Sequence, residues 1–244
     1  MPLDAGDLPG SQIYIPSAIS SFMRVKWDRL LFIGGILLLL VTPGSAATLT
    51  GQQWVMIDNT VQTAYTIPTG IWYNDNGLYV AIGYNQADGG YFNGTWFSAN
   101  GTTFTLLNTT CAWLPRVYAA SATFDGKMWL MAGTNPSTGV YFNDTWYSTD
   151  GKVWYRACPS CGWLPRKSSA ATVYGGKLWI SNGYDGTHSL KDTWFLTTAN
   201  ESSGTWTRAG DTADQYYGHV MASFAGKLWI IGATKTIWTT DGQT

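Results

Sequence analysis

The chain has 244 residues, a formal net charge of −1 and no run of basic or acidic residues. Nucleic acid is therefore excluded as an expected partner, because phosphate backbones are bound by clustered Lys and Arg side chains. Glutamate occurs once, at Glu201, and histidine twice, at His188 and His219. An acid–base pair of two glutamates and a three-histidine metal centre are both impossible, and we expect neither a metal nor another cofactor.

The first 47 residues read as a targeting segment. The apolar run Leu30–Val41 follows three basic residues and precedes the small residues Ser45-Ala46-Ala47. The run is too short for a typical membrane span, so it predicts a secretory signal peptide and a mature domain over residues 48–244. The alternative is an uncleaved signal anchor, which would be the only membrane attachment. Met23 is a second possible start, which would leave residues 1–22 untranslated. We expect a secreted or cell-surface protein.

Beyond residue 48 the chain repeats about every 50 residues. Three aromatic columns carry the repeat: Tyr79, Trp129, Trp179 and Trp229; Trp96, Trp146, Trp194 and Trp238; and Phe104, Trp154 and Trp206. A glycine follows each member of the first column: Gly83, Gly133, Gly183 and Gly232. In one unit we expect strands at 116–124, 127–133, 145–148 and 153–156, with tight turns at Asp125-Gly126 and Asp150-Gly151. Such a period predicts an all-β repeat protein, with most tryptophans packed in its core.

Several motifs resemble the kelch repeat. The sequences Trp113-Leu114-Pro115-Arg116 and Trp163-Leu164-Pro165-Arg166 match the entry of a kelch unit into its first strand, and Gly218-His219 matches a pair common there. The family's glycine doublet is reduced to one glycine, and the first unit lacks the arginine. Ser148–Trp154 is similar to a shortened Asp-box. The resemblance covers residues 48–244 and implies a kelch-type β-propeller.

The start of this region supplies the part of the repeat that is missing at its end. Thr50-Gly51-Gln52-Gln53-Trp54 parallels Asp150–Trp154, whereas the last unit stops at Asp241-Gly242, where its outer strand is due. We therefore expect about four blades, with the N-terminal strand pairing beside residues 237–239 to complete the last one. A fragment of a larger propeller is the alternative.

Function is expected in the loops at one end of the sheets. Aromatic side chains with a few charged ones suit a protein or glycan ligand. The candidate ligand-binding residues are Trp113, Arg116, Tyr141, Trp163, Arg166, Asp185, His188 and Tyr217. For the two arginines, structural hydrogen bonding between blades is the stronger interpretation, and Asp144 and Asp192 read as turn residues. The expected function is a non-catalytic recognition module. The alternative is a divergent carbohydrate-active enzyme, similar to galactose oxidase or a sialidase.

Cysteines and sequons complete the candidate sites. Cys158 and Cys161 are candidates for a disulfide, although Cys111, the repeat equivalent of Cys161, could pair with either. Asn-x-Ser/Thr sequons make five asparagines candidates for glycosylation: Asn93, Asn100, Asn108, Asn143 and Asn200.

Overall fold

The computed structural model describes residues 27–33, 36–41, 67–85, 89–198 and 204–242. The chain divides into two compact units, residues 1–55 and 56–244. In the first unit, β1 (Trp27–Ile33) and β2 (Ile36–Val41) form an antiparallel hairpin over the apolar run. No helix among the described residues has the length and apolar character needed to cross a membrane.

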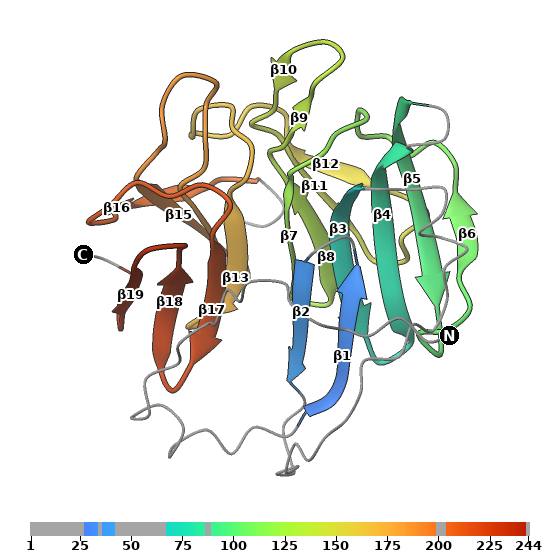
Figure 1. Ribbon diagram of the computed structural model, residues 1–244, viewed down its shortest axis with the longest axis horizontal. Coiled ribbons are helices and arrows are strands. Elements are labelled where there is room, and N and C mark those ends of the chain that lie inside the picture. Colours follow the sequence, from blue (N-terminus) through green and yellow to red (C-terminus); the bar gives the residue numbers. More distant parts are fainter. Residues whose placement is uncertain (1–26, 34–35, 42–66, 86–88, 199–203, 243–244) are drawn as a thin grey trace, which may run out of the picture. The chain divides into compact units, whose positions relative to one another are not determined.

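Within its described residues, the second unit is all-β and contains four consecutive antiparallel sheets and one additional short hairpin (Figure 1). In each sheet the strands follow in chain order, so every sheet is a meander. The first contains β3 (Ile67–Asn74), β4 (Gly77–Asn85), β5 (Gly90–Ser98) and β6 (Thr105–Asn108). The second contains β7 (Ala120–Phe124), β8 (Lys127–Met131), β11 (Thr145–Ser148) and β12 (Tyr155–Cys158), and a short hairpin of β9 (Thr134–Asn135) and β10 (Val140–Tyr141) lies between β8 and β11.

The third and fourth sheets repeat this order. The third contains β13 (Ala170–Tyr174), β14 (Lys177–Ser181), β15 (Asp192–Thr197) and β16 (Thr207–Asp211). The fourth contains β17 (Val220–Phe224), β18 (Lys227–Ile231) and β19 (Thr236–Thr239). The first strands of consecutive sheets lie side by side, β3 with β7, β7 with β13 and β13 with β17. The repeat in the sequence is therefore a repeat of sheets.

The aromatic columns contribute most of their members to the core between sheets, whereas Trp238 of the second column is 51% exposed. The first column lies on the second strand of each sheet, and the indole N–H of Trp129, Trp179 and Trp229 donates to the carbonyl five residues earlier, at 2.9 to 3.1 Å. Buried Trp129 and Met131 of the second sheet pack with Leu178 and Ile180 of the third. Apolar surface is thus removed from water on both sides of a central sheet.

Two kinds of turn fix the strand register. Asp125-Gly126 has positive φ at both residues, the backbone of a type I′ hairpin turn, and Ala225-Gly226 repeats it. In the turn after β11, the Asp150 carboxylate accepts hydrogen bonds from the backbone N–H groups of Lys152 and Val153, and the Ser148 hydroxyl accepts from that of Gly151. Asn100 and Ser98 make the equivalent bonds in the first sheet. This network is the local reason for the Asp-box-like pattern.

The outer strands begin later than the sequence suggests. We expected a strand at 153–156, but β12 spans Tyr155–Cys158, and the equivalent strand of the third sheet, β16, spans Thr207–Asp211. The Asp-box-like turn extends to Val153, and the indole of Trp154 is buried with its N–H directed to the Gly151 carbonyl at 3.3 Å. Those residues are therefore held in the turn, outside the ladder.

The fourth sheet differs from the other three. Within the described residues it has three strands, and β19 pairs only with β18. Its face remote from the third sheet exposes large apolar side chains: Val220, Phe224, Ile231 and Trp238. The second-sheet equivalents of the first three, Ala120, Phe124 and Met131, are buried against the third sheet. The strand expected to complete this sheet, at residues 51–54, lies outside the described residues.

Candidate functional site

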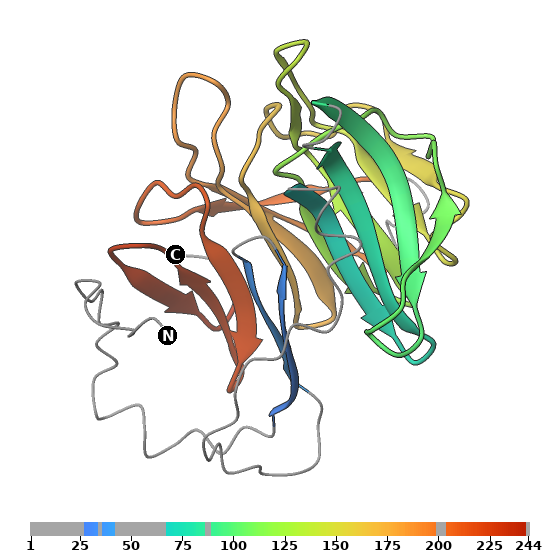
Figure 2. The ribbon, with the colours of Figure 1, turned by 45° about the vertical axis from the view of Figure 1, so that its right-hand side comes forward.

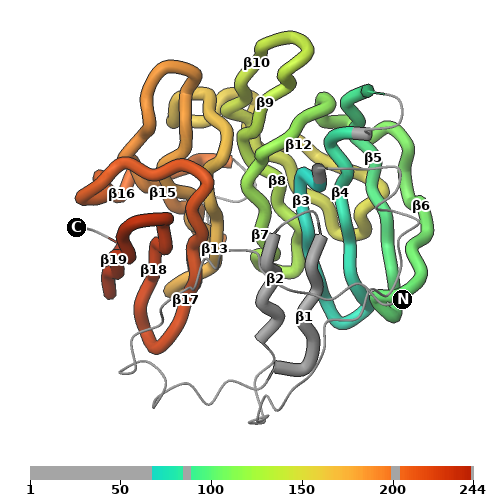
Figure 3. The backbone as a smooth tube through the Cα atoms, viewed as in Figure 1, coloured from blue at the N-terminus to red at the C-terminus, as the bar shows by residue number. Residues whose placement is uncertain are grey.

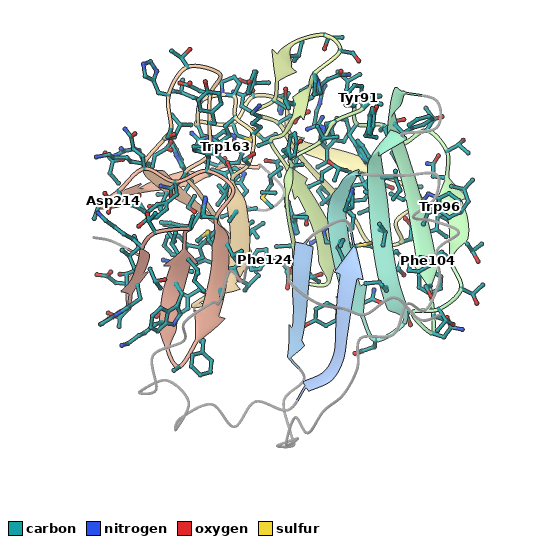
Figure 4. The ribbon with its side chains drawn as sticks, in the orientation of Figure 1. Tyr91, Trp96, Phe104, Phe124, Trp163 and Asp214 are labelled. Atoms are coloured by element: carbon teal, nitrogen blue, oxygen red, sulfur yellow. A yellow bond between two sulfur atoms is a disulfide. The ribbon has the colours of Figure 1, made fainter. Side chains whose placement is uncertain are left out.

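The loops that the sequence assigned to one end of the sheets do lie together. Antiparallel order places the connections from second to third strands, and the segments that enter each first strand, at the same end. Figures 2 and 3 show the β9–β10 hairpin and the loop between β14 and β15 projecting there. In Figure 4, Tyr91 lies at this end, whereas Phe104 lies toward the opposite end of the first sheet. We call the end of the sheets from which these loops project the loop end.

Arg116 and Arg166 are not available to a ligand, which corrects their assignment as candidate contacts. Both side chains are fully buried. Arg116 forms a two-pronged ion pair with Asp144, with N–O distances of 2.5 and 2.9 Å, and Arg166 forms the same pair with Asp192 at 2.6 and 2.7 Å. Their remaining donors bind backbone carbonyls, including those of Leu114 and Leu164.

The ion pairs lie within a sheet unit and tie its entry to the start of its third strand. Asp144 and Asp192 are therefore more than turn residues, since each also accepts the indole N–H two residues later. Burial raises the pKa of Asp192, but hydrogen bonds and charge from Arg166 outweigh it and hold the pKa below its usual value. This pairing builds the frame beneath the loop end.

Trp113 and Trp163 are also corrected, because both are buried in the core. The Trp163 ring packs against Trp206, with ring centroids 4.6 Å apart, and lies between the second and third sheets (Figure 4). Trp113 makes the equivalent edge contact with Trp154 at 6.2 Å. Two tryptophans that could have stacked on a ligand instead fill the space under the entry segments.

Asp185 and His188 lie at the loop end and interact with each other. The Asp185 carboxylate accepts the backbone N–H groups of His188 and Thr187 at 2.6 and 2.7 Å, and these bonds lower its pKa. The His188 ring is exposed and its Nδ1 lies 3.8 Å from the carboxylate. The pair caps the turn between β14 and β15, although the His188 ring itself faces solvent.

Among the candidate ligand-binding residues, Tyr141 and Tyr217 are tyrosines whose rings are at least partly exposed to solvent. Tyr217 is 65% exposed and packs beside Tyr184, with ring centroids 5.9 Å apart. Tyr141 is half-buried on β10 and faces Lys167. They are brought together by residues that the sequence analysis missed, namely Tyr118, Lys167 and Tyr184.

Lys167 is the centre of this group. Its ammonium nitrogen lies 5.6 Å from the ring centroids of Tyr141 and Tyr184 and 5.8 Å from that of Tyr118. Lys167 and Tyr184 also exchange both backbone hydrogen bonds, at 2.9 and 3.0 Å. We call Tyr118, Tyr141, Lys167, Tyr184 and Tyr217 the tyrosine–lysine cluster. A comparison of repeat positions could have found it, because Val117, Lys167 and Tyr217 are equivalent yet differ.

Cys158 and Cys161 are joined as a disulfide. Cys111 is a free, buried thiol, and its sulfur lies 3.6 Å from the Thr95 hydroxyl. Burial raises the pKa of this thiol to about 11 despite that contact, which keeps it protonated and unreactive at neutral pH.

The sequon asparagines differ in their surroundings. The Asn93 amide donates to the carbonyls of Cys111 and Trp113, both at 2.7 Å, and Asn143 makes the equivalent bonds to Cys161 and Trp163. Asn108 donates to Lys152, and Asn100 is exposed in its turn. Asn200 lies outside the described residues. The Asn93 and Asn143 amides thus serve the same frame as the buried arginines.

No protein-family model matches this chain, and no curated protein matches it. The assignment of function therefore rests on the loop end itself. Within the described residues, no group of three metal-ligating side chains gathers. What the loop end offers is a group of aromatic rings around the Lys167 ammonium, an arrangement suited to binding a ligand by stacking and charge.

Proposed function

We propose that the chain is an exported, non-catalytic recognition module that binds a glycan through its loop end. The observation that carries this proposal is the tyrosine–lysine cluster, in which partly exposed aromatic rings from three consecutive sheets meet. Tyrosine faces stack on the apolar faces of sugars, and rigid rings lose little conformational entropy on binding. A glycan is favoured over a protein ligand because the cluster consists of tyrosine rings around a single lysine.

A non-catalytic role is supported by what the polar side chains do. Asp144, Asp192, Arg116 and Arg166 are paired with each other inside the sheets. Asp185 caps its own turn. Carboxylates and arginines that an enzyme of the alternative class would direct at substrate are thus each engaged in holding the fold.

The same proposal includes a kelch-type propeller as the scaffold. Four consecutive meanders with their first strands adjacent are the arrangement expected of successive blades. The Pro-Arg entries and the buried arginines they place support the resemblance. The fourth sheet exposes an apolar face, where a propeller would continue either by closure onto the first sheet or by additional blades. Export is supported by the apolar run Leu30–Val41 and by the Cys158–Cys161 disulfide.

The test is binding of the purified chain to a glycan array. We expect saturable binding to a subset of glycans, weakened at least about tenfold by Tyr217→Ala, the scale of a lost aromatic anchor. Tyr155→Ala is the matched control, because Tyr155 is similarly exposed but stacks on Tyr147 in the outer strand β12. Absence of glycan binding, or chemical conversion of a bound glycan, would overturn the proposal.

A further inference from the structure

The Lys167 ammonium is a positive charge without a counter-charge in its sheet unit. Within the described residues it has no carboxylate partner and no hydrogen-bond acceptor. The buried arginines at the same end are each neutralised by an aspartate. Lys167 is half-buried and surrounded by three ring faces, at distances near the outer limit of a cation–π contact. Its side chain is therefore positioned by the rings while its charge remains available.

A comparison of the repeats shows that the lysine at position 167 is not required by the fold. Its equivalent in the second sheet, Val117, is buried, and the backbone bridge from Val117 to Thr134 matches that from Lys167 to Tyr184. The frame therefore does not require a cation at this position. A lysine at this position loses part of the hydration of its charge.

Tyr118 supplies a second, independent observation. Its φ is 56°, in the left-handed region, and its repeat equivalents Ser168 and Gly218 have φ of 55° and 65°. The conformation is imposed by the frame, because the N–H of Ser168 donates to the Tyr118 carbonyl and that of Gly218 to the Ser168 carbonyl, both at 2.9 Å. Glycine meets this demand without strain, whereas a bulky residue does not. Tyr118 is nonetheless 46% exposed, so the strain is not offset by burial of its ring.

We propose that the tyrosine–lysine cluster is a binding site for a sugar that bears a carboxylate, with Lys167 pairing the carboxylate and the tyrosines of the cluster contacting the sugar ring. This inference rests on the proposed function and names its ligand class. A strained, exposed tyrosine beside an unpaired ammonium fits a ligand with one anionic group on an otherwise apolar face. A neutral glycan would leave the half-desolvated ammonium without a partner.

The experiment measures dissociation constants of the full chain for uronic-acid and sialylated oligosaccharides and for their methyl esters. Esterification removes the charge and keeps the sugar. We expect the wild-type protein to bind the acids at least about tenfold more tightly than the esters, in line with one charge-assisted contact. Lys167→Met should abolish this preference, so that the variant binds the acids no more tightly than the esters.

A second variant, Tyr118→Gly, removes a tyrosine of the site without destabilising the fold, so a loss of binding cannot be due to unfolding. It should weaken binding of acids and esters alike and raise the melting temperature, because it relieves the left-handed strain. A merely structural tyrosine would give the opposite change in stability. Tyr155→Ala should leave the binding of acids and esters unchanged.

The outcomes separate the two proposals. Equal binding of acids and esters by the wild type, or a preference that survives Lys167→Met, would overturn the carboxylate site and leave glycan recognition standing. Binding of acidic peptides in place of every glycan would overturn both.

Discussion

At the scale of single residues, His219 is the clearest case in which position determines chemistry. It lies just before β17, is 8% exposed, and its Nε2 is 2.8 Å from the Ser181 hydroxyl. The Tyr216 ring packs beside it, at 5.8 Å between centroids, and supplies no charge. Burial lowers the pKa of His219 from 6.5 to about 4, so the ring is neutral in the folded protein at physiological pH.

This shift predicts an acid-sensitive stability. The unfolded chain takes up the proton near pH 6.5 and the folded chain only near pH 4, so stability is full above pH 6.5 and falls as the pH drops between these values. Between pH 7.5 and pH 5 we expect a loss of about 2 kcal/mol in the free energy of unfolding from this group. Urea unfolding at the two pH values measures it.

The matched variants are His219→Gln and His188→Gln. Glutamine at 219 does not titrate, so most of this loss should disappear. Replacing the exposed His188 should leave the loss in place. If both variants retained the wild-type dependence, another group would be responsible.

At the scale of elements, the same turn occurs three times within the described residues, with different side chains each time. Asn100, Asp150 and Asp241 occupy equivalent positions, each two residues after a serine or threonine whose hydroxyl lies within hydrogen-bond distance of the side-chain oxygen. What the turn needs is a short side chain with an acceptor oxygen, and a charge is optional.

We therefore expect Asp150→Ala to lower the free energy of unfolding by about 1 kcal/mol, the net value of the side-chain hydrogen bonds it removes. Asp150→Asn should lower it much less, since asparagine fills this position in the first sheet. Thermal or urea unfolding of the two variants decides the matter. Equal losses would mean that the carboxylate charge, and not its geometry, stabilises the turn.

At the scale of the whole molecule, the fourth sheet exposes an apolar face. The equivalent face of the second sheet is buried against the third sheet. Ile231 is 45% exposed, whereas its equivalent in the second sheet, Met131, is fully buried. Exposed apolar surface of this kind promotes association. Within the part of the chain that the structure describes, β19 is also an unpaired edge, which adds to that tendency.

The pair Ile231→Lys and Met131→Lys tests this arrangement. Met131→Lys should prevent folding, because it buries an unpaired charge. Ile231→Lys should change the free energy of unfolding by less than about 0.5 kcal/mol and reduce self-association in analytical ultracentrifugation. Strong destabilisation by Ile231→Lys would instead show that another sheet covers this face in solution, as a closed ring requires.

Sequence alone determined the strands that depend on local patterns. The tight Asp-Gly turn, the aromatic column on each second strand and the Asp-box-like turn are set by neighbours within about ten residues, and the structure has them where the spacing predicts. The all-β class and the division into equivalent sheets followed from the same period. The N-terminal segment beyond β2, and its expected pairing with the last sheet, lie outside the described residues.

The tertiary structure decided which repeated residues are functional candidates. Sequence spacing cannot distinguish Trp163, which fills the core, from Tyr217, which is exposed, since both stand in entry segments. It also cannot show that Arg166 is neutralised by Asp192 while its neighbour Lys167 is not, because each partner comes from a strand or loop distant in the chain. Burial and charge pairing arise only when sheets stack. The tyrosine–lysine cluster, drawn from three such sheets, therefore appeared only in the folded molecule.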